Sequence, residues 1–413
     1  MLKTILFSLL FLLCNNAESR DSLTTQVVVK QESAYIQPDT QKTIHRIEAE
    51  FLPAAILHTN DYLTGGNSEH RTMNHANTFR LKYALMQPSS SKQARIYGNP
   101  YQGIGAAYHE FNHQTGNPFS LYLFQGAQLA RLSKNMKLNY EWNFGLTFGW
   151  KPYDKVNNPD NHIIGSKVTA YMDLDVYLCW QFSEIMDLNV GVQVSHFSNG
   201  NTKLPNSGLN VLGVKMGLAC YFNRSEDFRE KRIEPKTPFA KHISYDLVVF
   251  GAWRSKGLID MGADGTDIIP GSAGVAGFSF SPTWNFSHKL NVSMALDGIY
   301  DHSANLTISK EYLRLEKYED RIRCTETPAA YRQMMLGLSA RSEFVMPYFS
   351  INAGVGHSVY GHGDMKGFYQ ILALKVNVWR HAYLHIGYSL HDFKIPNHLM
   401  LGIGYRFGSK RNI

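Results

Sequence analysis

The sequence has no long apolar run beyond its first residues. After Leu13, no stretch of about 18 consecutive apolar residues occurs, which excludes a membrane-spanning helix in the rest of the 413 residues. Charged residues make up only 18% of the chain, and the net charge is +7. This mild positive excess suits a phosphorylated glycolipid surface, and no segment resembles a nucleic-acid-binding module.

Cysteine is also scarce. The chain has four cysteines, of which Cys14 lies in the amino-terminal leader and three remain: Cys179, Cys220 and Cys324. Three cysteines cannot all pair with one another, and Cys220 falls on the apolar face of a predicted strand. We therefore expect no disulfide framework.

The first 19 residues predict a secretory signal peptide. Lys3 precedes an apolar run from Ile5 to Leu13, and small or polar residues follow as far as Ser19. The run is too short to cross a bilayer as a helix. Residues 20–44 are polar and rich in Ser, Thr and Gln, so we expect a disordered periplasmic lead-in.

Aromatic residues and glycine, by contrast, are abundant. Aromatics make up 13% of the chain, there are 33 glycines, and many segments alternate between apolar and polar positions. With a signal peptide, this pattern is typical of an antiparallel outer-membrane β-barrel. A secreted β-sandwich is the alternative, but its solvated face would carry charges rather than glycine and small polar residues. We predict the first eight strands at 46–56, 76–86, 102–111, 118–130, 135–150, 164–182, 185–198 and 209–222.

A charged segment divides the chain. Nine of the eighteen residues from 223 to 240 are charged and two are proline, which predicts a linker. We expect an all-β fold of two tandem eight-stranded barrels, residues 45–222 and 241–413. One barrel of about sixteen strands, enclosing an aqueous channel, is the alternative. The second set of strands is predicted at 243–253, 272–287, 289–302, 331–345, 348–360, 367–380, 382–393 and 398–407.

The two halves look like a duplication. LNVGVQVSHF at 188–197 corresponds to LHIGYSLHDF at 384–393, and LPNSGLN corresponds to IPNHLM. The second copy lacks the His-x-Ser of the first. Its His391 shares a face with His385 and Ser389, so we expect it to point into the barrel. The second half is predicted to be a degenerate, catalytically silent repeat.

One hairpin, Leu188 to Phe222, carries the chemistry. Because side chains alternate along a strand, His196 and Ser198 continue the apolar face that begins at Leu188. Asn210 occupies the same face of the return strand. A His-x-Ser pair on a strand is ordinarily a surface feature. Here it lies at the rim of an apolar face, with a polar residue on the neighbouring strand, where a hydrolase of membrane lipids needs it.

These residue types fit acyl-ester hydrolysis. A serine becomes a useful nucleophile when an adjacent histidine accepts its proton, so Ser198 and His196 are the predicted pair. A third group must hold the imidazole, and the amide oxygen of Asn210 can accept its N–H. The loop between the strands offers donors for an oxyanion hole at Asn199, Gly200 and Asn206.

The motif resembles the outer-membrane lipid A 3-O-deacylase family, including its acyloxyacyl hydrolase relatives. The similar stretches are HFSNG at His196 and LPNSGLN ending at Asn210, and upstream GNPFSLYLFQGAQL, LNYEWNFGLTFGW, KPYDKVNNPDN and IGSKVTAYMDL. The likeness spans roughly residues 95–222. It implies an eight-stranded barrel with its site toward the outer leaflet, Ser198 as nucleophile, His196 as base, and Asn199 and Asn206 near the oxyanion hole.

The family has a glutamate where this chain has Asn210. Glu141 and Asp154 are the candidates to replace that acid. A second resemblance accounts for the asparagine: outer-membrane phospholipase A has His-x-Ser-Asn-Gly and an Asn fourteen residues after the His, as His196 and Asn210 are spaced here. That family is calcium-dependent, dimeric and twelve-stranded.

The resemblance implies an outer-membrane serine esterase that removes an ester-linked acyl chain from lipid A and needs no cofactor. Its expected partners are lipopolysaccharide, the membrane and, by analogy with the phospholipase, a second copy in a homodimer. The alternatives are a phospholipase and a non-catalytic barrel for transport or anchoring.

His109 and His113 are predicted to be a loop cluster rather than a metal site. Residues expected in the interfacial aromatic girdles are Tyr122, Trp142, Trp150, Tyr177 and Trp180.

Overall fold

The structure is a computed structural model that describes residues 42–88, 91–224, 238–259, 266–268, 272–308, 325–392 and 395–408. The predicted signal peptide and most of the predicted lead-in and linker lie outside these ranges. The chain divides into two compact units, and each unit contains one barrel wall. No helix among the described residues is long and apolar enough to cross a membrane.

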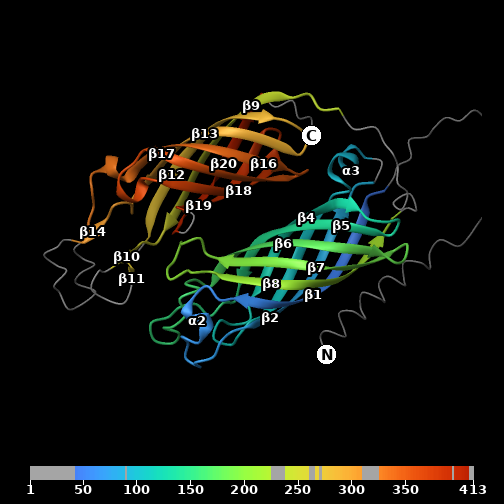
Figure 1. Cartoon of the computed structure of the whole chain (residues 1–413), viewed down its shortest axis with the longest axis horizontal. Helices are drawn as coiled ribbons and strands as arrows, with labels where there is room; N and C mark the ends of the chain where they lie inside the picture. The colour runs from blue at the N-terminus through green and yellow to red at the C-terminus, as the bar shows by residue number, and fades with distance from the viewer. Residues whose placement is uncertain are drawn as a thin grey trace, which may run out of the picture. The chain divides into compact units, whose positions relative to one another are not determined.

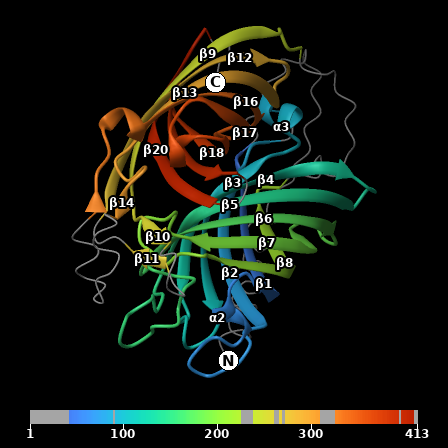
Figure 2. The ribbon, with the colours of Figure 1, turned by 60° about the vertical axis from the view of Figure 1, so that its left-hand side comes forward.

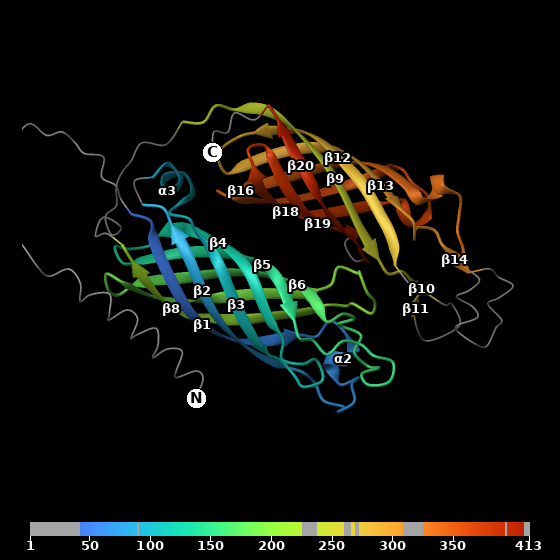
Figure 3. The same ribbon diagram turned by 180° about the vertical axis from the view of Figure 1, so that it is seen from behind.

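The first barrel is a closed antiparallel sheet in which each strand pairs with the next and β8 pairs back onto β1. Figure 1 shows β6, β7 and β8 on its near wall, and Figure 3 shows β1 to β5 on the opposite wall. Short helices α2 (Asp61–Thr64) and α3 (Lys92–Tyr97) lie in two connections. The strands are β1 (Ile44–Leu57), β2 (His75–Met86), β3 (Tyr101–Glu110), β4 (Phe119–Arg131), β5 (Met136–Phe148), β6 (Val168–Gln181), β7 (Met186–Ser198) and β8 (Leu209–Phe222).

The second barrel is also closed, with eight long strands, and β20 pairs with β9 (Figure 2). The prediction of two eight-stranded barrels is therefore confirmed, and the single barrel of about sixteen strands is wrong. The long strands are β9 (His242–Arg254), β12 (Ala273–Asn285), β13 (Leu290–Asp301), β16 (Met334–Val345), β17 (Phe349–Tyr360), β18 (Phe368–Trp379), β19 (Ala382–His391) and β20 (Ile395–Phe407). Its connections hold two small strand pairs and two 3₁₀ turns, namely β10 (Gly257–Ile259) with β11 (Thr266–Ile268), β14 (Thr307–Ile308) with β15 (Thr325–Glu326), η3 (Ala330–Gln333) and η4 (Gly363–Met365).

Strand alternation explains the faces of each wall. On β7, Leu188, Val190, Val192 and Val194 are exposed on the outside, whereas the intervening Asn189, Gln193 and Ser195 are buried in the lumen. An apolar exterior with a polar interior is the arrangement that a lipid-embedded barrel requires. Since the period is two, a slip of one residue would turn every one of these side chains to the wrong face.

Ion pairs fill the lumen of the first barrel. Lys215 Nζ lies 2.7 Å from both Glu50 and Asp175, and Lys82 Nζ lies 2.7 Å from Glu141. Arg80 is 2.6 Å from Asp173. These charges come from β1, β2, β5, β6 and β8, so the network ties strands across the barrel. An eight-stranded barrel is narrow enough for its own side chains to fill it in this way.

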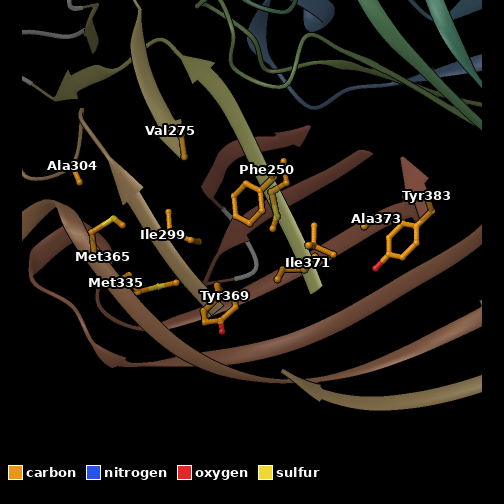
Figure 4. Packing of buried hydrophobic residues seen from close by; sticks show 12 residues of the cluster. Phe250, Val275, Ile299, Ala304, Met335, Met365, Tyr369, Ile371, Ala373 and Tyr383 are labelled. Atoms are coloured by element: carbon orange, nitrogen blue, oxygen red, sulfur yellow. The ribbon is translucent and has the colours of Figure 1, made fainter. Parts of the chain in front are cut away.

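The lumen of the second barrel is divided between charge and apolar packing. Asp246 is bonded by Lys375 at 2.8 Å and by Arg406 at 2.6 Å. Figure 4 shows an apolar cluster that includes Phe250, Ile299 and Met335. The histidine His391, expected to point inward, is half-buried at the end of β19, where its Nε2 lies 3.3 Å from Asp392.

Two expectations need correction. Tyr122, Trp150 and Tyr177 are buried rather than part of an interfacial girdle. Strand alternation accounts for both tyrosines, because Tyr177 shares the inward face of β6 with Asp173 and Asp175, and Tyr122 shares the inward face of β4 with Ser120. Among the described cysteines, Cys179 is free and buried but Cys220 is disulfide-bonded, which departs from the expectation of no disulfide framework.

Candidate active site at the rim of the first barrel

The β7–β8 hairpin brings His196 and Asn210 together. The two residues are direct cross-strand partners, and both are half-buried on the outer face. His196 Nδ1 and Asn210 Oδ1 are 2.6 Å apart. An amide oxygen only accepts, so Nδ1 carries the proton in this tautomer and Nε2 is left with its lone pair.

Ser198 is the last residue of β7 and shares the outer face with His196. Its Oγ accepts hydrogen bonds from Asn206 Nδ2 at 2.9 Å and from the Gly200 N–H at 3.1 Å. A hydroxyl has two acceptor lone pairs and one donor hydrogen. With both lone pairs engaged, the O–H of Ser198 remains as the donor, and the neighbouring imidazole on the same face is a suitable acceptor.

The loop from Asn199 to Gly208 is shaped by left-handed backbone. Gly200 and Asn201 both have φ of 64°, and Gly208 has φ of 75°. Glycine and asparagine tolerate this region, so a tight turn can follow Ser198 directly. The turn aims the Gly200 N–H back at the serine oxygen.

Hydrogen bonds fix the orientation of Asn206. Its Oδ1 accepts from the backbone N–H of Asn199 at 3.1 Å, and its Nδ2 also donates to Asn201 Oδ1 at 3.2 Å. The amide group is thus held with its nitrogen toward Ser198. The side-chain nitrogen of Asn199 donates to Lys203 O and Ser166 Oγ, at 2.7 and 3.1 Å, and the place of Asn199 at the oxyanion hole stays a prediction.

The connection between β5 and β6 supports this loop. Gly208 N–H donates to Ile163 O at 3.0 Å, and Ser207 N–H donates to His162 O at 3.2 Å. A Cβ on Gly165 would lie 2.5 Å from Pro205 O, so the two backbones meet where only glycine fits. The sequence did not reveal this partnership, although 151–161 and 164–174 are among the stretches that carried the family resemblance.

The two carboxylates proposed to replace the missing acid lie elsewhere. Glu141 is inside the lumen, where its oxygens bond Lys82 and Tyr101 at 2.7 and 2.9 Å. Asp154 Oδ1 accepts from the N–H groups of Val156 and Asn157 in its own loop. Asn210 is the side chain that the structure brings to His196.

The predicted loop cluster of His109 and His113 needs correction, because His109 lies on strand β3 and not in a loop. It is buried in the lumen, with Nδ1 2.9 Å from Thr78 and Nε2 2.8 Å from Ser120, whereas His113 is exposed and pairs with Glu69. Among the described residues, the carboxylates of Glu50, Glu141 and Asp175 do come within 4.8 Å of one another. The Lys215 ammonium already lies between them, so a positive charge of the protein occupies the place of a cation.

Two family models match the chain. Residues 77–219 match lipid A 3-O-deacylase, and residues 243–410 match acyloxyacyl hydrolase, C-terminal domain. The family resemblance stated from the sequence is therefore confirmed. No curated protein matches the chain.

Solved outer-membrane proteins also match. A structure titled outer membrane enzyme PagL is 17% identical over 41% of this chain and 97% of its own, with a TM-score of 0.29. Neisserial surface protein A is 10% identical over 44% of this chain and 97% of its own, with a TM-score of 0.27.

Proposed function

We propose that this outer-membrane chain, whose first barrel matches the lipid A 3-O-deacylase family and whose second matches the acyloxyacyl hydrolase C-terminal domain, removes an ester-linked acyl chain from lipid A. The observation that carries the proposal is the hydrogen bonding at the rim. His196 is held by Asn210, and Ser198 faces two donors, on a wall that is otherwise apolar.

The first half of the reaction forms an acyl-enzyme. His196 Nε2 takes the proton of the Ser198 hydroxyl while the serine oxygen attacks the ester carbonyl. The serine oxygen releases a lone pair for the attack, and the Gly200 N–H and Asn206 Nδ2, which donate to it in the resting site, turn to the carbonyl oxygen as that atom gains charge. The protonated imidazole then gives its proton to the departing sugar oxygen, and the acyl group stays on Ser198.

Water completes the cycle. A water molecule replaces the deacylated glycolipid, His196 takes one of its protons, and the resulting hydroxide attacks the acyl carbon. The bond to Ser198 breaks, the serine oxygen recovers the proton, and the fatty acid leaves. Asn210 keeps the imidazole oriented throughout. As a neutral amide, it does not balance the positive charge of the imidazolium as a carboxylate does.

The surroundings of the site suit an amphiphilic substrate. On the outer wall next to the pair, Val194 and Leu212 are each 47% exposed, so acyl chains meet apolar side chains there. The adjoining loops carry the exposed Lys167 and Lys203, and the Asn199 side chain donates to Ser166 Oγ, the neighbour of Lys167, and to Lys203 O. Ammonium groups in these positions attract the phosphates of lipid A.

Lipid A from cells that produce the wild-type protein or Ser198→Ala, compared by mass spectrometry, tests the proposal. We expect the wild type to shift lipid A by the mass of one acyl chain and the variant to leave it fully acylated. Both proteins must migrate as heat-modifiable barrels on gels. Unchanged acylation with folded wild-type protein would refute the proposal.

A phospholipase activity is the second candidate, because the third residue is an asparagine and reaches the imidazole, as the second sequence resemblance implies. The two candidates separate on purified substrates. The deacylase releases fatty acid from lipopolysaccharide in the presence of EDTA. The phospholipase releases it from phospholipid vesicles and requires added calcium. The predicted homodimer stays a prediction, which cross-linking in membranes tests.

A further inference from the structure

Phe197 stands between the proposed base and the proposed nucleophile. Its neighbours His196 and Ser198 face outward, so strand alternation turns the Phe197 ring into the lumen. The ring is fully buried, with 0% of its surface exposed. The side chain that separates the two catalytic groups in sequence is therefore part of the interior packing of the barrel.

Phe197 belongs to a cluster of rings from four parts of the first barrel. Its ring centroid lies 5.0 Å from His109, 5.3 Å from Tyr171, 5.4 Å from Phe111 and 5.5 Å from Trp150. Three of these contacts are edge-on, with interplanar angles of 77–85°. Edge-to-face packing is a favoured geometry of aromatic pairs and fixes the ring from several directions. We call these five residues the inner aromatic cluster.

The cluster is anchored to the barrel wall through His109. Both ring nitrogens of His109 are engaged, Nδ1 with Thr78 and Nε2 with Ser120. Ser120 continues to Thr147 at 2.7 Å. This chain of hydrogen bonds crosses β2, β3, β4 and β5. His109 also stacks on Phe111 at 5.6 Å, and Phe111 stacks on Trp150 at 5.4 Å. The inner aromatic cluster thus joins β7 to the opposite strands.

We propose that Phe197 is a positioning residue: the inner aromatic cluster holds the end of β7 so that His196 and Ser198 keep their relative geometry. Ser198 is the last residue of the strand and is followed at once by a turn. The ends of strands unfold locally more easily than their middles, so a site at a strand end needs stabilising contacts from the interior. A displacement of about 1 Å between reacting groups can lower a rate roughly 100-fold. This inference rests on the proposed esterase function.

The test compares Phe197→Leu with Phe124→Leu in the full-length protein. Phe124 is a comparably buried lumen aromatic that packs on Tyr101 and Lys82 and does not contact Phe197; Tyr122 lies between it and Tyr171 of the inner aromatic cluster. The substrate is purified lipopolysaccharide in detergent micelles. We expect Phe197→Leu to lower kcat about tenfold or more with KM nearly unchanged, and Phe124→Leu to keep kcat within about twofold. Phe197→Met, which refills the space with a flexible side chain, should recover part of the loss.

A second readout reports the geometry directly. A fluorophosphonate probe labels the activated serine, so its rate of reaction measures the Ser198–His196 pair without lipid binding. We expect slower labelling of Phe197→Leu but not of Phe124→Leu, at equal heat-modifiability on gels. Should both variants lose activity and labelling equally, Phe197 is a packing residue only and the inference is wrong. Should Ser198→Ala retain wild-type activity, the proposed function itself fails, whatever Phe197→Leu does.

Discussion

The last hairpins of the two barrels place their histidines and serines on opposite faces of the wall. In β7, the histidine and serine lie on the outer wall, with the histidine paired to an amide across the hairpin. In β19 and β20, His385, Ser389 and His398 lie on the inner wall and are almost completely buried. Histidine and serine therefore face lipid in one hairpin and the lumen in the other, because a shift of one residue along a strand moves a side chain to the opposite face.

The connecting loops differ as well. The β7–β8 loop has ten residues from Asn199 to Gly208, two left-handed glycines and an asparagine aimed at the serine. The matching asparagine of the second barrel, Asn397, accepts a hydrogen bond from Arg254 and so belongs to an ion-pair cluster with Asp301. The proposed chemistry needs both the outward register and the loop of donors, and in the described part of the second barrel His385, Ser389 and His398 have the inward register instead.

The largest expected difference between the two barrels comes from replacing the serine of each hairpin. We expect Ser198→Ala to lower deacylation of lipopolysaccharide by about 1,000-fold or more, since the nucleophile is lost. The matched variant Ser389→Ala should keep wild-type activity. Fatty acid release in micelles measures both. A large loss in Ser389→Ala with an intact barrel would place the chemistry in the second half.

The paired asparagines give the next contrast. Asn206→Ala removes the side-chain donor that faces Ser198, and loss of one such donor typically costs about 100- to 1,000-fold in kcat. Asn397→Ala, at the corresponding position after proline, should change kcat less than twofold. The comparison fails if kcat of Asn206→Ala stays within threefold of wild type while its Ser198 remains reactive to fluorophosphonate.

Substitutions at Asn210 test what the asparagine does at the position where the deacylase family has a glutamate. Asn210→Ala leaves His196 Nδ1 without its acceptor, and we expect kcat to fall about 10- to 100-fold through the wrong tautomer. Asn210→Glu restores an acceptor and adds a charge that stabilises the imidazolium, so its kcat should equal or exceed that of wild type. Steady-state kinetics on lipopolysaccharide measure both. A Glu variant as slow as the Ala variant would contradict the assigned role.

The smallest effect concerns the loop lysines. Lys203→Glu reverses a charge beside the site, and we expect KM for lipopolysaccharide to rise a few-fold at low salt with kcat unchanged, since exposed charges are screened. The control is Lys366→Glu, an exposed lysine in a loop of the second barrel. Equal KM for the two variants would show that Lys203 does not recognise the substrate.

The strands were well predicted from the sequence because apolar alternation is a local signal. The strands predicted at 185–198 and 209–222 are observed at Met186–Ser198 and Leu209–Phe222. The same alternation placed His196, Ser198 and Asn210 on one outer face. The register that puts His196 opposite Asn210 then follows from the hairpin.

The interior could not be predicted in the same way. Glu141 was a candidate acid because a carboxylate in a sequence looks the same whether it faces a site or an ion-pair partner such as Lys82. Contacts between distant segments, such as Phe197 with Trp150 or Gly208 with Ile163, leave no periodic trace. They depend on barrel closure, which brings together residues far apart in the chain.

The seam of the first barrel has a consequence for the architecture of the whole chain. Because β1 is hydrogen-bonded to β8, His45 lies opposite Phe222, and in the second barrel Tyr245 likewise lies opposite Phe407. Each wall therefore starts and finishes at the same place. A further domain can be fused to the chain at that place without interrupting the hydrogen bonds of a closed barrel, so barrels of this kind can follow one another in a single chain.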